Sequence, residues 1–339
     1  MRRKRLGMLL ILFFLAAFAN PQILAPEAKR HYEAGVKAFQ DNDLERAERE
    51  FRATLQIDPR FAEARQNLGV TLAQKHNFGA ALREFRVVAA DRPSSAEAQY
   101  NLGLTLFELR ADLAARQHFL RAVQLRSNYA EAYNNLGLLS ERSGDLPGAL
   151  ERFRTAVRIK PDFAQAHNNL GHALMEREET DAAVEQYRQA LALRPDFPEA
   201  HENLGLALWK QHDLEGAATE FREAAKLGLD EAQLSLGTVL GEQGNLEGAI
   251  AVHRQAVAVL PTDADAHYLL GVGLQHRGDL DAAVSELSRP SGLTGRWWPR
   301  ACIWVPLSGS EVILPERRQI SGPQLNSLHK MPRCTTSWP

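Results

Sequence analysis

The chain has 339 residues, of which 45% are apolar and 24% are charged, and this is the composition of a soluble globular protein. Its formal net charge of −2 is the sum of three unlike regions. Residues 1–5 hold four basic side chains, and residues 289–339 hold seven basic and two acidic ones. Residues 6–288 are left with 29 basic and 40 acidic side chains, a net charge of −11. Such an acidic body argues against nucleic acid as a partner, because phosphate binding needs clustered cations, and favours proteins with neutral or basic segments.

The first 19 residues have the pattern of a secretory signal. The basic start "MRRKR" is followed by an apolar run at 6–19 that ends in "AFA". A basic start, a short apolar core and small residues at an A-x-A site predict an export signal at 1–19, cleaved before Asn20. A short linker at 20–27 would follow. We therefore expect an exported protein, periplasmic or secreted.

The same stretch has an alternative interpretation as an uncleaved anchor. No charged residue occurs between Leu6 and Pro26, and this stretch is barely long enough to span a bilayer. In that case residues 6–26 would attach the chain to the inner membrane. We expect no other contact with a membrane.

One short pattern recurs through most of the chain. A glycine returns every 34 residues, with one step of 32, at Gly35, Gly69, Gly103, Gly137, Gly171, Gly205, Gly237 and Gly271. An alanine follows each glycine by 12 residues, and a large residue, in most repeats an aromatic one, follows each alanine by four. We therefore predict eight repeats of one unit between residues 28 and 288, the last of them incomplete.

Each unit has the pattern of two amphipathic helices. Apolar residues recur at helical spacing around the glycine, as in "AYNNLGLL" at 132–139, and "SGDL" at 143–146 supplies a turn. A second amphipathic stretch follows, as in "AVEQYRQALAL" at 183–193, and a proline ends it. Glycine and alanine are small where the two antiparallel helices approach closely, and the aromatic residue fills the space beside them. This packing explains why the chain tolerates a glycine that costs a helix about 1 kcal/mol.

These residues resemble the tetratricopeptide repeat (TPR) family, whose 34-residue pattern is W-x2-L-G-x2-Y, then A-x3-F, then P. The L-G, A, F and P positions are nearly all present, whereas the leading tryptophan is replaced by His31, Arg65, Gln99, Tyr133, His167, His201, Gln233 and His267. The resemblance implies an all-α fold, a right-handed α-α superhelix of helical hairpins whose first helices line a concave groove. It implies an interaction scaffold without specifying a pathway. The sixth repeat is locally similar to the related Sel1-type variant, with Gly228 as its predicted C-cap.

An amide side chain recurs on the face of the first helices that lines the groove in this family. We number each repeat so that its glycine is position 8; position 6 is then Asn67, Asn101, Asn135, Asn169 and Asn203, which we call the amide row. An amide offers both a donor and an acceptor, so such a row can hold the main chain of an extended peptide. The row is similar to that of TPR arrays in protein glycosyltransferases. The alternative is that these asparagines bridge neighbouring helices or hold water.

The predicted peptide-binding site adds residues at two further positions. They are Asn134 and Asn168 at position 5, and Phe107 and Trp209 at position 12. Position 9 is mostly aliphatic and is expected to pack against the next repeat. Position 2 is mostly acidic, so the basic clamp of chaperone-binding arrays is missing. Acidic side chains near a helix N-terminus interact favourably with the helix dipole, and here they would also make the groove more negative.

The sequence contains no motif of catalytic chemistry. No Gly-rich phosphate loop, H-E-x-x-H or nucleophile elbow occurs, and we expect neither an enzyme nor a cofactor. A metal is not expected either, because His167 and His172 lie about 140° apart round a helix. Both cysteines, Cys302 and Cys334, lie near the C-terminus, so the repeats hold no disulfide.

The repeat pattern stops at residue 288. Residues 289–339 have no periodicity, and they contain four of the five tryptophans and seven of the sixteen prolines. This segment is either a natural, disordered tail or the product of a frameshift near codon 289. If it is natural, a disulfide between its two cysteines is conceivable in an oxidising compartment.

The sequence therefore predicts an exported, non-catalytic scaffold that binds an extended segment of another protein in the groove of a TPR superhelix. One alternative is the substrate-recruiting arm of a larger, glycosyltransferase-like enzyme that was truncated by the frameshift. Another is a structural subunit whose groove stays unoccupied.

Overall fold

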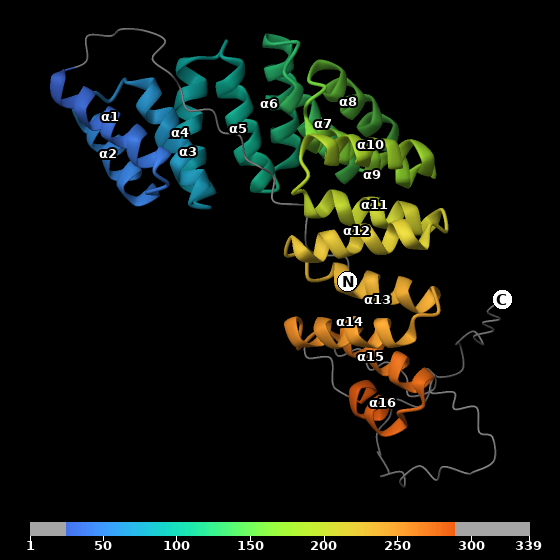
Figure 1. Cartoon of the computed structure of the whole chain (residues 1–339). Helices are drawn as coiled ribbons and strands as arrows, with labels where there is room; N and C mark the ends of the chain where they lie inside the picture. Colours follow the sequence, from blue (N-terminus) through green and yellow to red (C-terminus); the bar gives the residue numbers. More distant parts are fainter. Residues whose placement is uncertain (1–24, 289–339) are drawn as a thin grey trace, which may run out of the picture. The chain divides into compact units, whose positions relative to one another are not determined.

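The computed structural model describes residues 25–288, and within this range it contains sixteen α-helices and no strand (Figure 1). The helices are α1 (Pro26–Gln40), α2 (Leu44–Ile57), α3 (Ala62–Gln74), α4 (Phe78–Asp91), α5 (Ala96–Glu108), α6 (Asp112–Leu125), α7 (Ala130–Arg142), α8 (Leu146–Ile159), α9 (Ala164–Glu176), α10 (Thr180–Leu193), α11 (Pro198–Lys210), α12 (Leu214–Lys226), α13 (Ala232–Glu242), α14 (Leu246–Val259), α15 (Ala264–Arg277) and α16 (Leu280–Leu287). They form eight consecutive helical hairpins, and each hairpin packs on the next one. The predicted all-α fold is confirmed, and its first helix begins two residues earlier than expected.

Two neighbouring residues form the turn inside a hairpin, one through its backbone conformation and one by capping the next helix. Between α7 and α8, Gly144 has a φ of +78°, a conformation that glycine adopts without strain. The next residue, Asp145, accepts a hydrogen bond from the backbone N–H of Gly148 at 3.0 Å and so caps the N-terminus of α8. The helix then ends at Ile159, just before Pro161. The "SGDL" turn and the proline stop therefore act as the sequence predicted.

In the first six repeats the glycine lies against the Phe or Tyr of the second helix. A Cβ atom built on Gly69 would lie 2.7 Å from Cε1 of Phe85, and one on Gly205 would lie 2.8 Å from Cε1 of Phe221. Real Cβ atoms do not approach a ring carbon so closely, so only glycine fits at this position. The close approach that the sequence predicted is confirmed.

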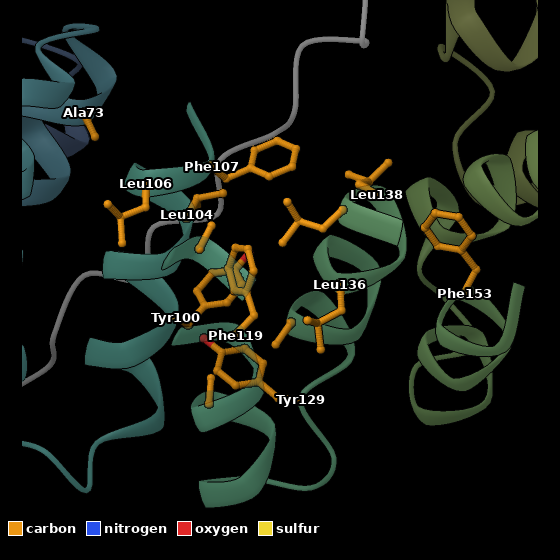
Figure 2. Packing of buried hydrophobic residues seen from close by; sticks show 14 of the residues in the cluster. Ala73, Tyr100, Leu104, Leu106, Phe107, Phe119, Tyr129, Leu136, Leu138 and Phe153 are labelled. Carbon is orange, nitrogen blue, oxygen red and sulfur yellow. The ribbon is translucent and has the colours of Figure 1, made fainter. Parts of the chain in front are cut away.

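Aromatic rings join successive repeats as well as the two helices of one repeat. The ring centroids of Tyr100 on α5 and Phe119 on α6 are 5.7 Å apart, and that of Tyr129, just before α7, lies 4.8 Å from Tyr100. Figure 2 shows these rings together with Leu104 and Leu136. Most of the buried apolar side chains from α1 to α14 belong to one continuous core. Each repeat is therefore stabilised by the repeats beside it.

The shorter step between the sixth and seventh repeats changes the helix ends. The second helix of the sixth repeat, α12, stops at Lys226, and Gly228 follows with a φ of +89°, as its predicted role at the C-terminal end requires. Helix α13 has 11 residues, and no side chain caps its N-terminus. The similarity to Sel1-type repeats stays an interpretation.

Several predictions fall outside the described residues. They concern the export signal or anchor, most of the linker, the segment 289–339 and its two cysteines. Among the helices of residues 25–288, none combines the length and the apolar character that crossing a membrane requires.

Candidate functional site

The amide row lies on the first helices of five successive repeats, α3, α5, α7, α9 and α11. The side chains of Asn67, Asn101, Asn135 and Asn169 are buried, whereas Asn203 is half-buried. Burial raises the free-energy cost of any amide that lacks a partner. The hydrogen bonds of the row therefore decide what it can still bind.

Asparagine pairs link the fourth, fifth and sixth repeats. Asn169 Nδ2 donates to Asn134 Oδ1 at 2.9 Å, and Asn203 Nδ2 donates to Asn168 Oδ1 at 3.0 Å. In each pair, position 6 of one repeat donates to position 5 of the repeat before it. The doubled asparagine of "NNLG" thus gives each repeat both an acceptor for the next repeat and a donor to the previous one.

Tyrosine takes the acceptor role earlier in the array. Asn67 Nδ2 donates to the hydroxyl of Tyr32, and Asn135 Nδ2 donates to the hydroxyl of Tyr100, both at 3.1 Å. Burial raises the pKa of Tyr32 to about 12, so its hydroxyl stays neutral at ordinary pH. Four members of the amide row therefore bridge neighbouring helices, as the alternative interpretation expected, and their contact with a peptide stays a prediction.

Asn101 differs from the other members of the row. Its exposed fraction is 1%, and both its Nδ2 and its Oδ1 lack a hydrogen-bond partner among the residues that the structure describes. Both atoms are fully enclosed, so a bound peptide cannot reach them in this conformation. The member of the row that a peptide can approach is the half-buried Asn203, whose amide oxygen can accept from a peptide N–H.

The two aromatic residues of the predicted site have different surroundings. Phe107 is buried, and the guanidinium carbon of Arg142 lies 3.9 Å from its ring centroid. Trp209 is half-buried, and its Nε1–H donates to Glu242 at 2.8 Å. Its neighbour on α11, Leu206, is 40% exposed. The sixth repeat therefore presents apolar surface at positions 9 and 12.

Three of the acids of position 2 are paired with bases near the end of the same repeat. Glu63 accepts from Arg92 at 2.6 Å, and Glu131 accepts from Lys160 at 2.9 Å. Glu97 and Arg126 form the same pair at 2.8 Å. These ion pairs join the start of the first helix to the end of the second and neutralise charge that the sequence placed in the groove.

A histidine interrupts the aliphatic residues of position 9 in the fifth repeat. His172 Nδ1 lies 3.2 Å from Glu141 Oε1, and this hydrogen bond raises the pKa of the imidazole. His167 makes separate contacts, to Gln186 Oε1 at 2.9 Å and to the carbonyl of Pro161 at 3.0 Å. Within residues 25–288, no group of three or more His, Cys, Asp or Glu side chains could hold a metal ion.

Three solved structures are similar to this chain, and the first of them shares its type of fold. A chain of the APC/C hetero-tetramer Cut9-Hcn1 is 17% identical over 72% of this chain and 48% of its own, with a TM-score of 0.55. MamA protein is 28% identical over 50% of this chain and 93% of its own, with a TM-score of 0.44. YrrB, described as a TPR protein with an unusual peptide-binding site, is 26% identical over 51% and 89%, with a TM-score of 0.42. A search of curated proteins finds no match.

Family signatures match most of the hairpins. The "TPR repeat" signature matches residues 142–176, 171–212 and 237–275, and the "Tetratricopeptide repeat" signature matches residues 71–130. These ranges hold the recurring Gly, Ala and aromatic positions, and the fold of the first solved structure above agrees with them. The chain therefore belongs to the tetratricopeptide repeat family, whose fold is a scaffold for protein–protein interaction.

Proposed function

We propose that this protein is an exported, non-catalytic scaffold that binds an extended, neutral-to-basic segment of another protein along its first helices. The observation that carries the proposal is the surface of α11, where the half-buried Asn203 lies on the same helix as Leu206, which is 40% exposed, and the half-buried Trp209. The Nδ2 of Asn203 is bonded to Asn168, and its amide oxygen can accept from the N–H of a peptide unit. Recognition of this kind reads the main chain.

The surroundings of Asn203 favour the same kind of ligand. Leu206 lies one helical turn farther along α11, and this side chain and Trp209 give apolar side chains of the ligand a surface to pack on. No described residue favours the alternative of an enzyme's recruiting arm.

We expect the replacement of all five asparagines of the amide row with alanine to abolish peptide binding. The wild-type protein should enrich extended peptides from a random library displayed on phage. The five-residue variant should enrich none, and Asn203→Ala alone should weaken binding of the selected peptides by about tenfold, which is the order of one or two lost hydrogen bonds. The measurement is a titration of the selected peptides by calorimetry.

A matched control separates binding from folding. Asn128→Ala changes an exposed asparagine in the loop before α7 and should bind as the wild type does. All variants must show equal helicity by circular dichroism, because the amide row also bridges repeats. Equal affinity of the wild type and the five-residue variant for the same peptides would refute the proposal.

Export predicts a defined mature N-terminus. We expect a protein expressed with its native start in a Gram-negative host to be recovered from the periplasm, beginning at Asn20, because the A-x-A site precedes this residue. Intact mass and N-terminal sequencing measure this directly. Recovery from the inner membrane with Met1 in place would support the anchor instead, and recovery from the cytoplasm would contradict export.

A further inference from the structure

One side chain in the first helix of several repeats ties three segments together. In the second repeat, Arg65 donates through Nη1 to Glu84 Oε2 on α4 and through Nη2 to the carbonyl of Pro59, both at 2.8 Å. Glu84 belongs to the second helix of the same repeat, and Pro59 belongs to the loop that leads out of the repeat before. We call this three-point contact of a position-4 residue the clasp.

Histidine forms the clasp in the sixth repeat. His201 Nδ1 lies 2.6 Å from Glu220 Oε2 on α12, and its Nε2 lies 2.9 Å from the carbonyl oxygen of Pro195. Both partners are pure acceptors, so both ring nitrogens must carry a hydrogen. An imidazole meets this condition only as the imidazolium ion. Arginine meets it at every ordinary pH.

Two other repeats also have a histidine at position 4, and its partners differ between them. In the eighth repeat, His267 contacts Glu286 at 2.6 Å and the carbonyl of Pro261 at 3.1 Å, which repeats the acceptor-only geometry. In the fifth repeat, Gln186 occupies the position that glutamate has in the clasps of the sixth and eighth repeats, and its Oε1 lies 2.9 Å from Nδ1 of His167. An amide can turn and donate to the ring, so a neutral imidazole satisfies this clasp. The array therefore contains three forms of the clasp. Arg65 forms one that is always charged, His201 forms one that needs both ring nitrogens protonated, and His167 forms one that a neutral imidazole satisfies.

The charges around His201 favour its protonated state. The hydrogen bond to Glu220 is the largest cause that raises the pKa of His201; burial opposes it, and the Pro195 carbonyl adds to it. Glu223, also on α12, acts in the same direction and is itself bonded to Lys226 at 2.7 Å.

The loop before α11 brings two further charged groups. The guanidinium carbon of Arg194 lies 3.4 Å from the ring centroid of Phe197, and its charge interacts with Asp196 and with Glu199 of α11. These contacts are made within the loop and the first turn of α11. The group of the loop that contacts the imidazole is therefore the neutral carbonyl of Pro195.

We propose that the joint between the fifth and sixth repeats is a proton-dependent clasp, closed when both nitrogens of His201 carry hydrogen and weakened when one hydrogen is lost. This inference does not depend on peptide binding. Deprotonation would leave a ring lone pair facing an acceptor, so either the Glu220 contact or the Pro195 contact would be lost. Loss of the Glu220 contact would weaken the α11–α12 hairpin. Loss of the Pro195 contact would weaken the attachment of this hairpin to α10.

The direction of the pH dependence follows from the folded state. The pKa of His201 is higher in the folded protein than its ordinary value of 6.5. The clasp therefore contributes fully below about pH 6.5, and its contribution is lost as the pH rises through the folded pKa. A mildly alkaline medium should loosen the sixth repeat.

Hydrogen exchange of the full-length protein, expressed as protection factors at about pH 5.5 and about pH 8.5, tests the proposal. In the wild type, protection of α11 and α12 should fall at the higher pH by about tenfold for each unit by which the folded pKa is raised. Helices α3 and α4, held by the permanently charged Arg65, are the internal control and should not change. Equal changes in α3–α4 and α11–α12 would overturn the proposal.

Three variants assign the effect to the clasp. Glu220→Gln creates the His–Gln pair found in the clasp of the fifth repeat, and His201→Arg creates the Arg–Glu pair found in that of the second. Both variants should therefore remove the pH dependence of α11 and α12. Gln186→Glu should install the same pH dependence in α9 and α10. A wild-type pH profile in Glu220→Gln, or no change in Gln186→Glu, would show that His201 does not control the joint.

Discussion

Replacing Phe153 with alanine is expected to lower the free energy of unfolding by about 3–5 kcal/mol. The ring of Phe153, labelled in Figure 2, is fully buried on α8. It lies against Gly137 of α7, where glycine leaves no side chain to fill the space. The cavity would open inside the fourth repeat, in the middle of the array, and would weaken its contacts with both neighbours. Urea unfolding followed by circular dichroism measures the loss.

A surface leucine provides the control for this variant. Leu113 on α6 is 82% exposed, so Leu113→Ala should change the stability by no more than about 0.5 kcal/mol. An equal effect of the two substitutions would mean that the aromatic residue of the repeat does not hold the hairpin together.

Replacing Gly137 with alanine is the second substitution with a large expected effect. The new methyl group would collide with the ring of Phe153, whose Cδ1 would lie 2.7 Å away. Overpacking costs about 1–3 kcal/mol, whereas alanine adds about 1 kcal/mol of helix propensity. We therefore expect a net loss of up to about 2 kcal/mol in the same unfolding experiment.

Another helical glycine isolates the propensity part of this balance. A Cβ atom built on Gly79 of α4 has no neighbour within 4 Å, so Gly79→Ala should stabilise the protein by up to about 1 kcal/mol. If Gly137→Ala were equally stabilising, close packing would not be the reason for the repeated glycine.

The pairing of glycine and aromatic residue was predictable from the sequence because it depends on size alone. Each glycine recurs with an alanine and a large residue, in most repeats an aromatic one, at fixed distances, and only a close contact between two helices explains a small residue at such a place. The turn residues were predictable for a similar reason. Gly144 acts through its own backbone conformation, and Asp145 acts through a hydrogen bond to a residue three positions along the chain. Their roles can therefore be predicted without knowledge of the fold.

The hydrogen bonds of the amide row were harder to predict. They join position 6 of one repeat to position 5 of the previous one, and the partner is tyrosine in two cases and asparagine in two. A pattern search for identical residues does not group Tyr32 and Tyr100 with Asn134 and Asn168. What they share is an oxygen that accepts a hydrogen bond at the same position of the repeat.

The clasp was missed for a related reason. The first-helix histidines were interpreted as replacements of the family's packing tryptophan, yet His201 and His267 are hydrogen-bonded to a carboxylate and a carbonyl. The signal was present in the sequence as a glutamate 19 residues after each of these histidines and a proline six residues before it. Only the fold shows that these three positions meet.

The most direct test of the central claim, that the amide row holds the main chain of a bound segment, is an N-methyl scan of a peptide selected by the wild-type protein. Calorimetry would give the affinity of each analogue in which one backbone N–H is replaced by N–CH3. We predict that methylation of the unit facing Asn203 weakens binding by at least about tenfold, and by more than alanine in place of either adjacent side chain does. The same methylation should have no further effect on the Asn203→Ala protein. Affinity that depends on the peptide's side chains and tolerates methylation at every unit would contradict main-chain recognition.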